Sequence, residues 1–102
     1  GVVISVQGQI KKDTFDTFQR NVNRLPQGDF VVLFFQNIKN IENISPVFLQ
    51  DFIDLFSILS IKKKGLAVEQ KDLFVLLEAT AIKKKLPIFN TLMEAYEGVK
   101  KL

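Results

Sequence analysis

The feature that most constrains the fold is an unbroken apolar run, Phe-Val-Val-Leu-Phe-Phe, at residues 30–35. A run of this kind is typical of a strand that is buried on both of its faces. The composition of Pro26–Asp29 predicts a turn before it, and Asn37–Asn43 reads as a polar loop after it. Strands covered on both faces occur mostly in parallel sheets flanked by helices. The run therefore favours an α/β fold.

Short apolar segments alternate with longer segments of helical period along the rest of the chain. Further strands are predicted at about 2–7, 66–68 and 87–89, and helices at about 13–24, 46–61, 71–80 and 90–96. The pair Ser45-Pro46 is typical of a helix N-cap and first helical position. The order βαβαβαβα implies parallel strands joined by right-handed crossovers. We predict one domain over residues 1–102, a small α/β sandwich with a four-stranded, mainly parallel sheet and four helices.

The composition excludes several kinds of chemistry. The chain contains no histidine and no cysteine, which removes thiolate metal sites, cysteine nucleophiles and every Ser-His pair. Its carboxylates are scattered, and neither GxxxxGK[ST] nor GxGxxG is present. We therefore expect no enzymatic activity, no cofactor and no metal.

The charge and hydropathy of the chain bear on its partners and location. The net charge is +3, but only Arg20 and Arg24 among the 14 cations are arginine, so nucleic-acid binding is not expected. The longest apolar-rich stretch, Val47–Ile61, is interrupted by Asp51 and Asp54, so no membrane partner is expected either. A cytoplasmic location is the default expectation.

Three segments, in this order and spacing, resemble the STAS domain, the fold of bacterial anti-sigma factor antagonists and of the cytoplasmic tails of sulfate transporters. They are VQGQIKKDTF, VVLFFQNIKNIENISPVFL and IKKKLPIFNTLMEAYEGV, and within the first Gly8, Ile10 and Thr14 match the family pattern. The resemblance implies a non-enzymatic regulatory interaction module. Its expected partner is an anti-sigma factor or a kinase-like regulatory protein, bound at the start and outer face of the second helix.

The chain departs from this family at the phosphorylation motif. Family antagonists carry Asp-Ser-Ser-Gly at the start of the second helix, where one serine is phosphorylated. Aligning the apolar helix positions puts Ile44 at the phosphorylated serine and Ser45 at the glycine. A shift of one residue makes Ser45 the phosphosite, but then Gln50 and Asp51 fall on apolar positions. We therefore predict binding without the usual phosphorylation switch, with Ser45 as the alternative phosphosite.

Two groups of residues are the expected binding sites. The partner-binding residues lie in the loop before the second helix and on the outer face of that helix: Asn43, Ile44, Ser45, Val47, Asp51, Asp54 and Ile58. Lys11 and Lys12 precede the first helix and could receive an anion at its N-terminus, as in a small-ligand or nucleotide sensor.

The expected strand order is 2-1-3-4. The resembled family commonly has an additional strand before the one at Val2, and almost nothing precedes it here. In that order Phe30–Phe35 lies at the sheet edge, where an uncharged apolar strand invites pairing. The alternative function is therefore a scaffold that forms a homodimer through this edge, or that pairs it with a partner's strand.

Overall fold

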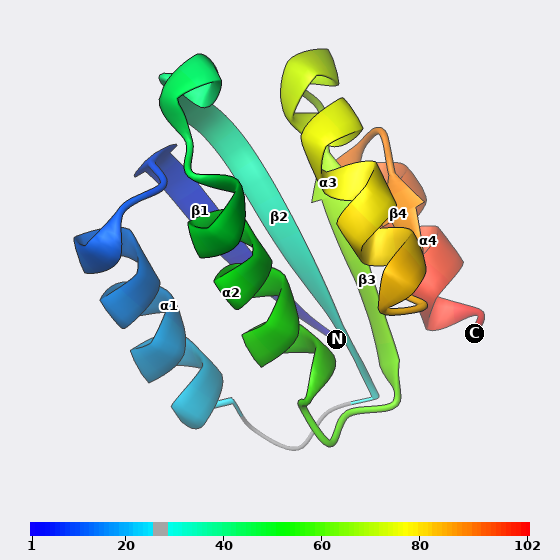
Figure 1. The fold of residues 1–102 in the computed structure, drawn as a ribbon. Helices are drawn as coiled ribbons and strands as arrows, with labels where there is room; N and C mark the ends of the chain where they lie inside the picture. Colours follow the sequence, from blue (N-terminus) through cyan, green and yellow to red (C-terminus); the bar gives the residue numbers. More distant parts are fainter. Residues whose placement is uncertain (26–28) are drawn as a thin grey trace.

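A computed structural model describes residues 1–25 and 29–102 of the chain (Figure 1). Most of the predicted turn at Pro26–Asp29 lies outside the described residues. The elements are β1 (Val2–Gln9), α1 (Lys12–Asn23), β2 (Phe30–Lys39), the short 3-10 helix η1 (Ile41–Asn43), α2 (Pro46–Ser57), β3 (Lys63–Val68), α3 (Lys71–Lys83), β4 (Ile88–Phe89) and α4 (Leu92–Lys100). The predicted α/β class, with four helices and four parallel strands, is confirmed.

The strand order in the sheet is β1-β2-β3-β4, so the expected order 2-1-3-4 is wrong. Each crossover connection places the next strand directly beside the previous one, and always in the same direction across the sheet. Because such crossovers are right-handed, all three connecting helices must lie on the same face of the sheet. Figure 1 shows α1, α2 and α3 side by side in front of the strands, with α4 behind β3 and β4.

β2 lies inside the sheet and not at its edge. It pairs with β1 along Val31–Lys39 and with β3 along Phe30–Phe35. The expectation that Phe30–Phe35 is an edge available to a second copy or to a partner's strand is therefore wrong. The outermost strand on this side is β1, whose polar residues Ser5 and Gln7 are exposed.

The two faces of β2 serve two separate cores. Val31, Leu33 and Phe35 belong to the large core beneath α1, α2 and α3. Phe30, Val32 and Phe34 pack on the other face with residues of α4. The alternation of side chains along a strand thus explains why no polar residue is tolerated from Phe30 to Phe35.

Phe52 is the central aromatic side chain of the large core. It is fully buried, and its ring centroid lies 5.0 Å from that of Phe15, 5.2 Å from that of Phe18 and 6.3 Å from that of Phe35. These contacts join α2 to α1 and to β2. Since aromatic pairs in such geometry add to the free energy of burial, Phe52 is the main connection among the three elements.

The end of α2 differs from the prediction. The helix ends at Ser57 and not near Ile61, and Lys63 and Lys64 begin β3. The Lys64 ammonium folds back and donates hydrogen bonds to the carbonyl oxygens of Ser57 and Leu59, the latter at 2.9 Å. Lys64 therefore supplies the positive charge at this helix end from the following strand.

The other helix boundaries differ by a few residues. α1 begins at Lys12, and the Thr14 hydroxyl donates a 2.6 Å hydrogen bond to the carbonyl oxygen of Gln9 instead of capping the helix. α3 and α4 extend to Lys83 and Lys100, beyond the predicted ends. Periodicity alone does not fix these ends, because the last turns of α3 and α4 each contain a single buried residue, Ala81 and Val99.

We expect Phe52→Ala to destabilise the fold by about 3–5 kcal/mol, because it removes a fully buried ring and leaves a cavity. Val47→Ala on the same helix is the control, since Val47 is 71% exposed. Denaturant unfolding followed by circular dichroism measures both. Equal losses of stability in the two variants would contradict the packing described for α2.

We expect Lys64→Met to lower the free energy of unfolding by about 1 kcal/mol, because two carbonyl groups at the end of α2 lose their donor. Lys62→Met is the control, since Lys62 is exposed.

Partial burial lowers the pKa of the Lys64 amino group. At a pH between the lowered pKa of the folded chain and the ordinary pKa of the unfolded chain, the unfolded chain holds a proton on Lys64 that the folded chain has lost. The free energy of unfolding of the wild type should therefore rise with pH through this alkaline range. A pH series of unfolding curves in which the wild type and Lys64→Met stay parallel would contradict this.

Candidate functional site

The chain between β2 and α2 turns sharply at the carboxyl end of the sheet. Asn40 has a φ of 55° and begins the turn into η1, where the Asn43 amide donates to the carbonyl oxygen of Asn40 at 2.9 Å. Ser45 then caps α2, because its hydroxyl oxygen accepts a 3.4 Å hydrogen bond from the Phe48 amide. The predicted N-cap role of Ser45 is confirmed.

Gln70 holds the end of β2 against the start of α3. Its side-chain oxygen accepts from the Ile38 amide at 2.7 Å, and its side-chain nitrogen donates to the Ile38 carbonyl oxygen at 2.9 Å. This bidentate contact satisfies both backbone groups of Ile38 after the strand has lost its neighbour β3, which ends at Val68. It also fixes the first turn of α3 beside η1.

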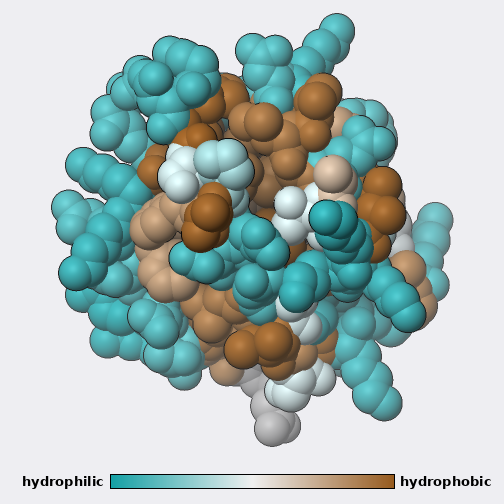
Figure 2. Space-filling model, in the orientation of Figure 1, coloured by the Kyte–Doolittle hydropathy of each residue, from teal (hydrophilic) through white to brown (hydrophobic). Residues whose placement is uncertain are grey.

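A groove of about 630 Å³ lies between η1, the start of α2 and the first two turns of α3. One wall carries Ile41, Glu42, Ile44 and Pro46, and the other carries Asp72, Val75 and Leu76. Figure 2 shows hydrophobic atoms gathered in this region, between the tops of α2 and α3 as they are seen in Figure 1. We call these seven residues the α2–α3 groove.

The groove combines apolar walls with carboxylates. Val75 is 69% exposed and Leu76 is 46% exposed, although both are large aliphatic residues. Glu42 and Asp72 are exposed and lie on opposite walls. Such a hollow has the apolar contact area and the charge needed to bind a peptide or helix that carries apolar and basic residues.

The structure brings together only part of the predicted partner-binding set. Ile44 is half-buried and lines the α2–α3 groove, and Ser45 is exposed beside it. Asn43 and Ile44 also line a smaller hollow of about 140 Å³ with Gln9, Lys39 and neighbours of these residues. The loop Asn43–Ser45 therefore stands between two depressions at the same end of the sheet.

The residues predicted on the outer face of α2 are spread along the helix. Val47 and Asp51 are exposed, and Ile58, at the far end, is 76% exposed. With a rise of about 1.5 Å per residue, Ile58 lies about 16 Å along the axis from Val47. The Asp54 carboxylate is 3.1 Å from the Lys84 ammonium, and this salt bridge ties α2 to the end of α3. These four residues do not form one compact site with the loop.

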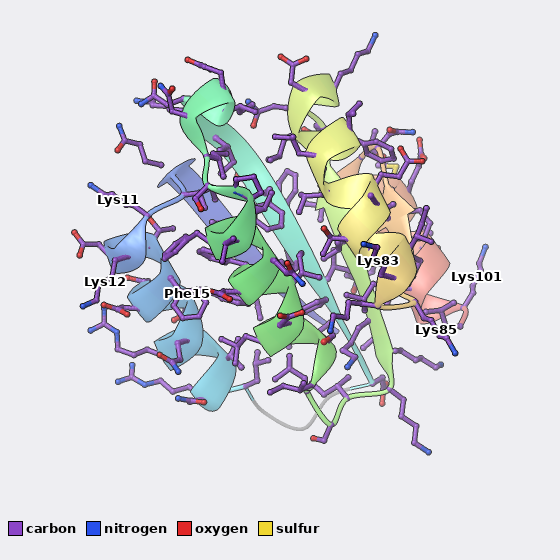
Figure 3. All side chains as sticks on the ribbon, in the orientation of Figure 1. Lys11, Lys12, Phe15, Lys83, Lys85 and Lys101 are labelled. Atoms are coloured by element: carbon purple, nitrogen blue, oxygen red, sulfur yellow. The ribbon has the colours of Figure 1, made fainter. Side chains whose placement is uncertain are left out.

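Lys11 and Lys12, the predicted anion site, lie at the start of α1. Both are exposed, and Figure 3 shows their side chains directed away from the body of the molecule. A separate hollow of about 260 Å³ runs between β1 and α1 and is lined by residues such as Ser5, Gln7 and Thr17. The two lysines do not converge on a shared point in Figure 3.

The α3 wall of the groove was missed from the sequence. Asp72, Val75 and Leu76 were assigned only to a helix, and nothing local to them indicates that η1 lies alongside. One signal was available, because α3 carries apolar residues at exposed as well as at buried positions. A helix that is apolar on all sides is normally covered on all sides.

Comparison of the chain with known protein families, with curated proteins and with solved structures finds no match. Within residues 1–25 and 29–102, no three acidic side chains lie close enough together to hold a metal ion. None of the described helices is long and apolar enough to cross a membrane.

We expect Gln70→Ala to lower stability by about 1–3 kcal/mol, because it leaves two backbone groups of Ile38 without partners. The same change should increase hydrogen exchange at the Ile38 amide and at η1. Gln50→Ala is the control, because Gln50 is an exposed residue on α2. Unchanged protection of Ile38 in Gln70→Ala would show that this side chain does not hold β2 and α3 together.

Proposed function

We propose that this chain is a non-enzymatic regulatory module that binds a protein partner in the α2–α3 groove. The observation that carries the proposal is the groove itself, where Val75 and Leu76 expose aliphatic surface opposite the loop that precedes α2. Exposed apolar area of this kind, bordered by charged residues, is typical of protein interaction sites.

The resemblance to STAS domains suggests the class of partner. In that family the start of the second helix contacts the anti-sigma factor, and the corresponding segment here, Asn43–Ser45, adjoins the groove. We therefore propose an anti-sigma factor or a kinase-like regulatory protein as the partner. A cytoplasmic location is part of the same proposal, because such regulators act there in the resembled family.

We also propose that binding is not controlled by phosphorylation at the usual position. The residue aligned with the family phosphoserine is Ile44, a half-buried aliphatic wall of the groove. Ser45 is exposed and caps α2, where a phosphate would meet the positive end of the helix dipole. Ser45 is thus the position at which a switch would have to act if one exists.

The test uses two groove variants, Leu76→Glu and Ile44→Asp, one on each wall. With a purified anti-sigma or kinase-like partner, calorimetry should show at least a tenfold rise in Kd for each, which corresponds to about 1.4 kcal/mol. Gln19→Glu on the exposed side of α1 is the control and should bind as the wild type does. A partner that binds both groove variants as tightly as the wild type would overturn the proposed site.

A second pair of variants tests the switch. Ser45→Asp keeps an N-cap residue and adds a negative charge, so we expect stability and Kd close to those of the wild type. Ser45→Ala loses the cap and should cost about 0.5–2 kcal/mol of stability without loss of binding. Mass spectrometry of native material reads the modification directly. Phosphorylated Ser45, together with weak binding by Ser45→Asp, would mean that the family switch survives at this residue.

A further inference from the structure

The outward face of α3 carries an apolar stripe formed by Val75, Ala79 and Ile82. At 3.6 residues per turn these three side chains fall within about 60° of one another around the helix axis. They point away from the buried side, which is formed by Leu73, Leu77 and Ala81. Val75 is 69% exposed and Ile82 is 65% exposed, and Ala79 between them is exposed as well. The stripe is therefore solvent-facing along the length of the helix.

On one side of this stripe, charges of opposite sign lie at its two ends, and Lys71 and Glu78 are exposed on its other side. Asp72 is in the first turn of α3 and Lys83 is in the last turn. Both are exposed, and they fall within about 20° of each other around the helix axis, close to the stripe. The midpoint between them in sequence is 77–78, about one residue from the middle of the stripe. Figure 3 shows Lys83 on the side of α3 that faces the viewer, near its C-terminal end.

We propose that α3 packs against α3 of a second copy of this chain, antiparallel and about a twofold axis near residues 77–78. In this arrangement Asp72 faces the partner subunit's Lys83, and the same pair forms again on the other side of the axis. Val75 packs against the partner subunit's Ala79, whose small side chain allows the two helices to approach closely. A twofold interface of this kind requires one surface that is its own complement.

The charges of Asp72 and Lys83 favour a second copy as the occupant and outnumber the one like-charge contact, between the two Glu78 side chains on the other side of the stripe near the axis. A helix lying antiparallel on this face must offer a cation opposite Asp72, an anion opposite Lys83 and apolar residues between them. α3 has that pattern in reverse direction, so it satisfies both ends at once. A parallel pair would place Asp72 opposite Asp72 and Lys83 opposite Lys83, which is unfavourable.

The expected dimer is weak and depends on concentration. Two helices of 13 residues bury less than the ~1,200 Å² of a standard interface. This inference does not rest on the proposed function. Val75 belongs both to the stripe and to the α2–α3 groove. A second copy on α3 would therefore cover part of one wall of the groove.

Sedimentation equilibrium over a wide range of concentrations tests the dimer. We expect a monomer–dimer equilibrium for the wild type and at least a tenfold weaker one for Ala79→Glu, which places a charge in the middle of the stripe. Gln50→Glu on the exposed side of α2 is the control, and circular dichroism checks that each variant folds. A wild type that is monomeric at the highest concentration would overturn the proposal, and so would a dimer that Ala79→Glu leaves unchanged.

A charge exchange tests the antiparallel geometry. Asp72→Lys alone and Lys83→Glu alone should each weaken self-association, because each places like charges opposite one another twice. An equimolar mixture of the two variants should associate again, since both contacts between unlike variants are then attractive. If the mixture stays as weak as either variant alone, these two residues do not face each other and the geometry is wrong.

Cross-linking gives an independent reading because the chain has no cysteine. Ala79→Cys should form a disulfide-linked dimer under mild oxidation faster than Gln50→Cys, since residue 79 lies near the proposed axis. Equal rates would contradict the interface. Ile44→Asp, which changes the groove wall away from α3, should leave self-association unchanged, so failure of the groove proposal and failure of the dimer are distinguishable.

Discussion

The burial of β2 on both faces is the constraint on which the rest of the structure depends. Its six apolar residues from Phe30 to Phe35 must be covered by α1–α3 on one side and by α4 on the other. In the interior of the sheet, β1 and β3 also satisfy the backbone groups of this strand. The position of each helix then follows, because right-handed crossovers in a single direction place three helices on one face and leave α4 for the other.

The same topology creates the groove. When α1, α2 and α3 all lie on one face, the loops leaving β2 and β3 rise side by side at the carboxyl end of the sheet. η1 and the first turns of α3 are thereby brought together, and the Gln70 side chain holds them in place through Ile38. Because that contact joins residues 32 apart in sequence, the groove depends on tertiary packing and not on either segment alone.

The fold class followed from local patterns, whereas the strand order and one wall of the groove did not. The Phe30–Phe35 run and the helical periods are read directly from the residues that form the elements. Strand order is set by contacts between segments that are distant in sequence, so no single segment shows it. A weaker indication was present in β1, where Ser5 and Gln7 alternate with Ile4 and Val6. This alternation is typical of an outer strand with one open face. Ile44 was predicted as a partner-binding residue because the resembled family contacts its partner at the start of the second helix. Leu76 could be placed opposite Ile44 only by the packing of α3.

The amount of apolar surface on α3 sets a limit on how the isolated chain can behave. A helix that buries Leu73 and Leu77 beneath it has no need of Val75, Leu76 and Ile82 for its own fold. Those side chains cost solubility when they face water, so their presence favours a covered state of the helix. The groove and the stripe offer two ways to cover them, and both include Val75. Since one side chain cannot pack against two occupants at once, the two proposals together predict that binding of a partner and self-association of the chain oppose each other.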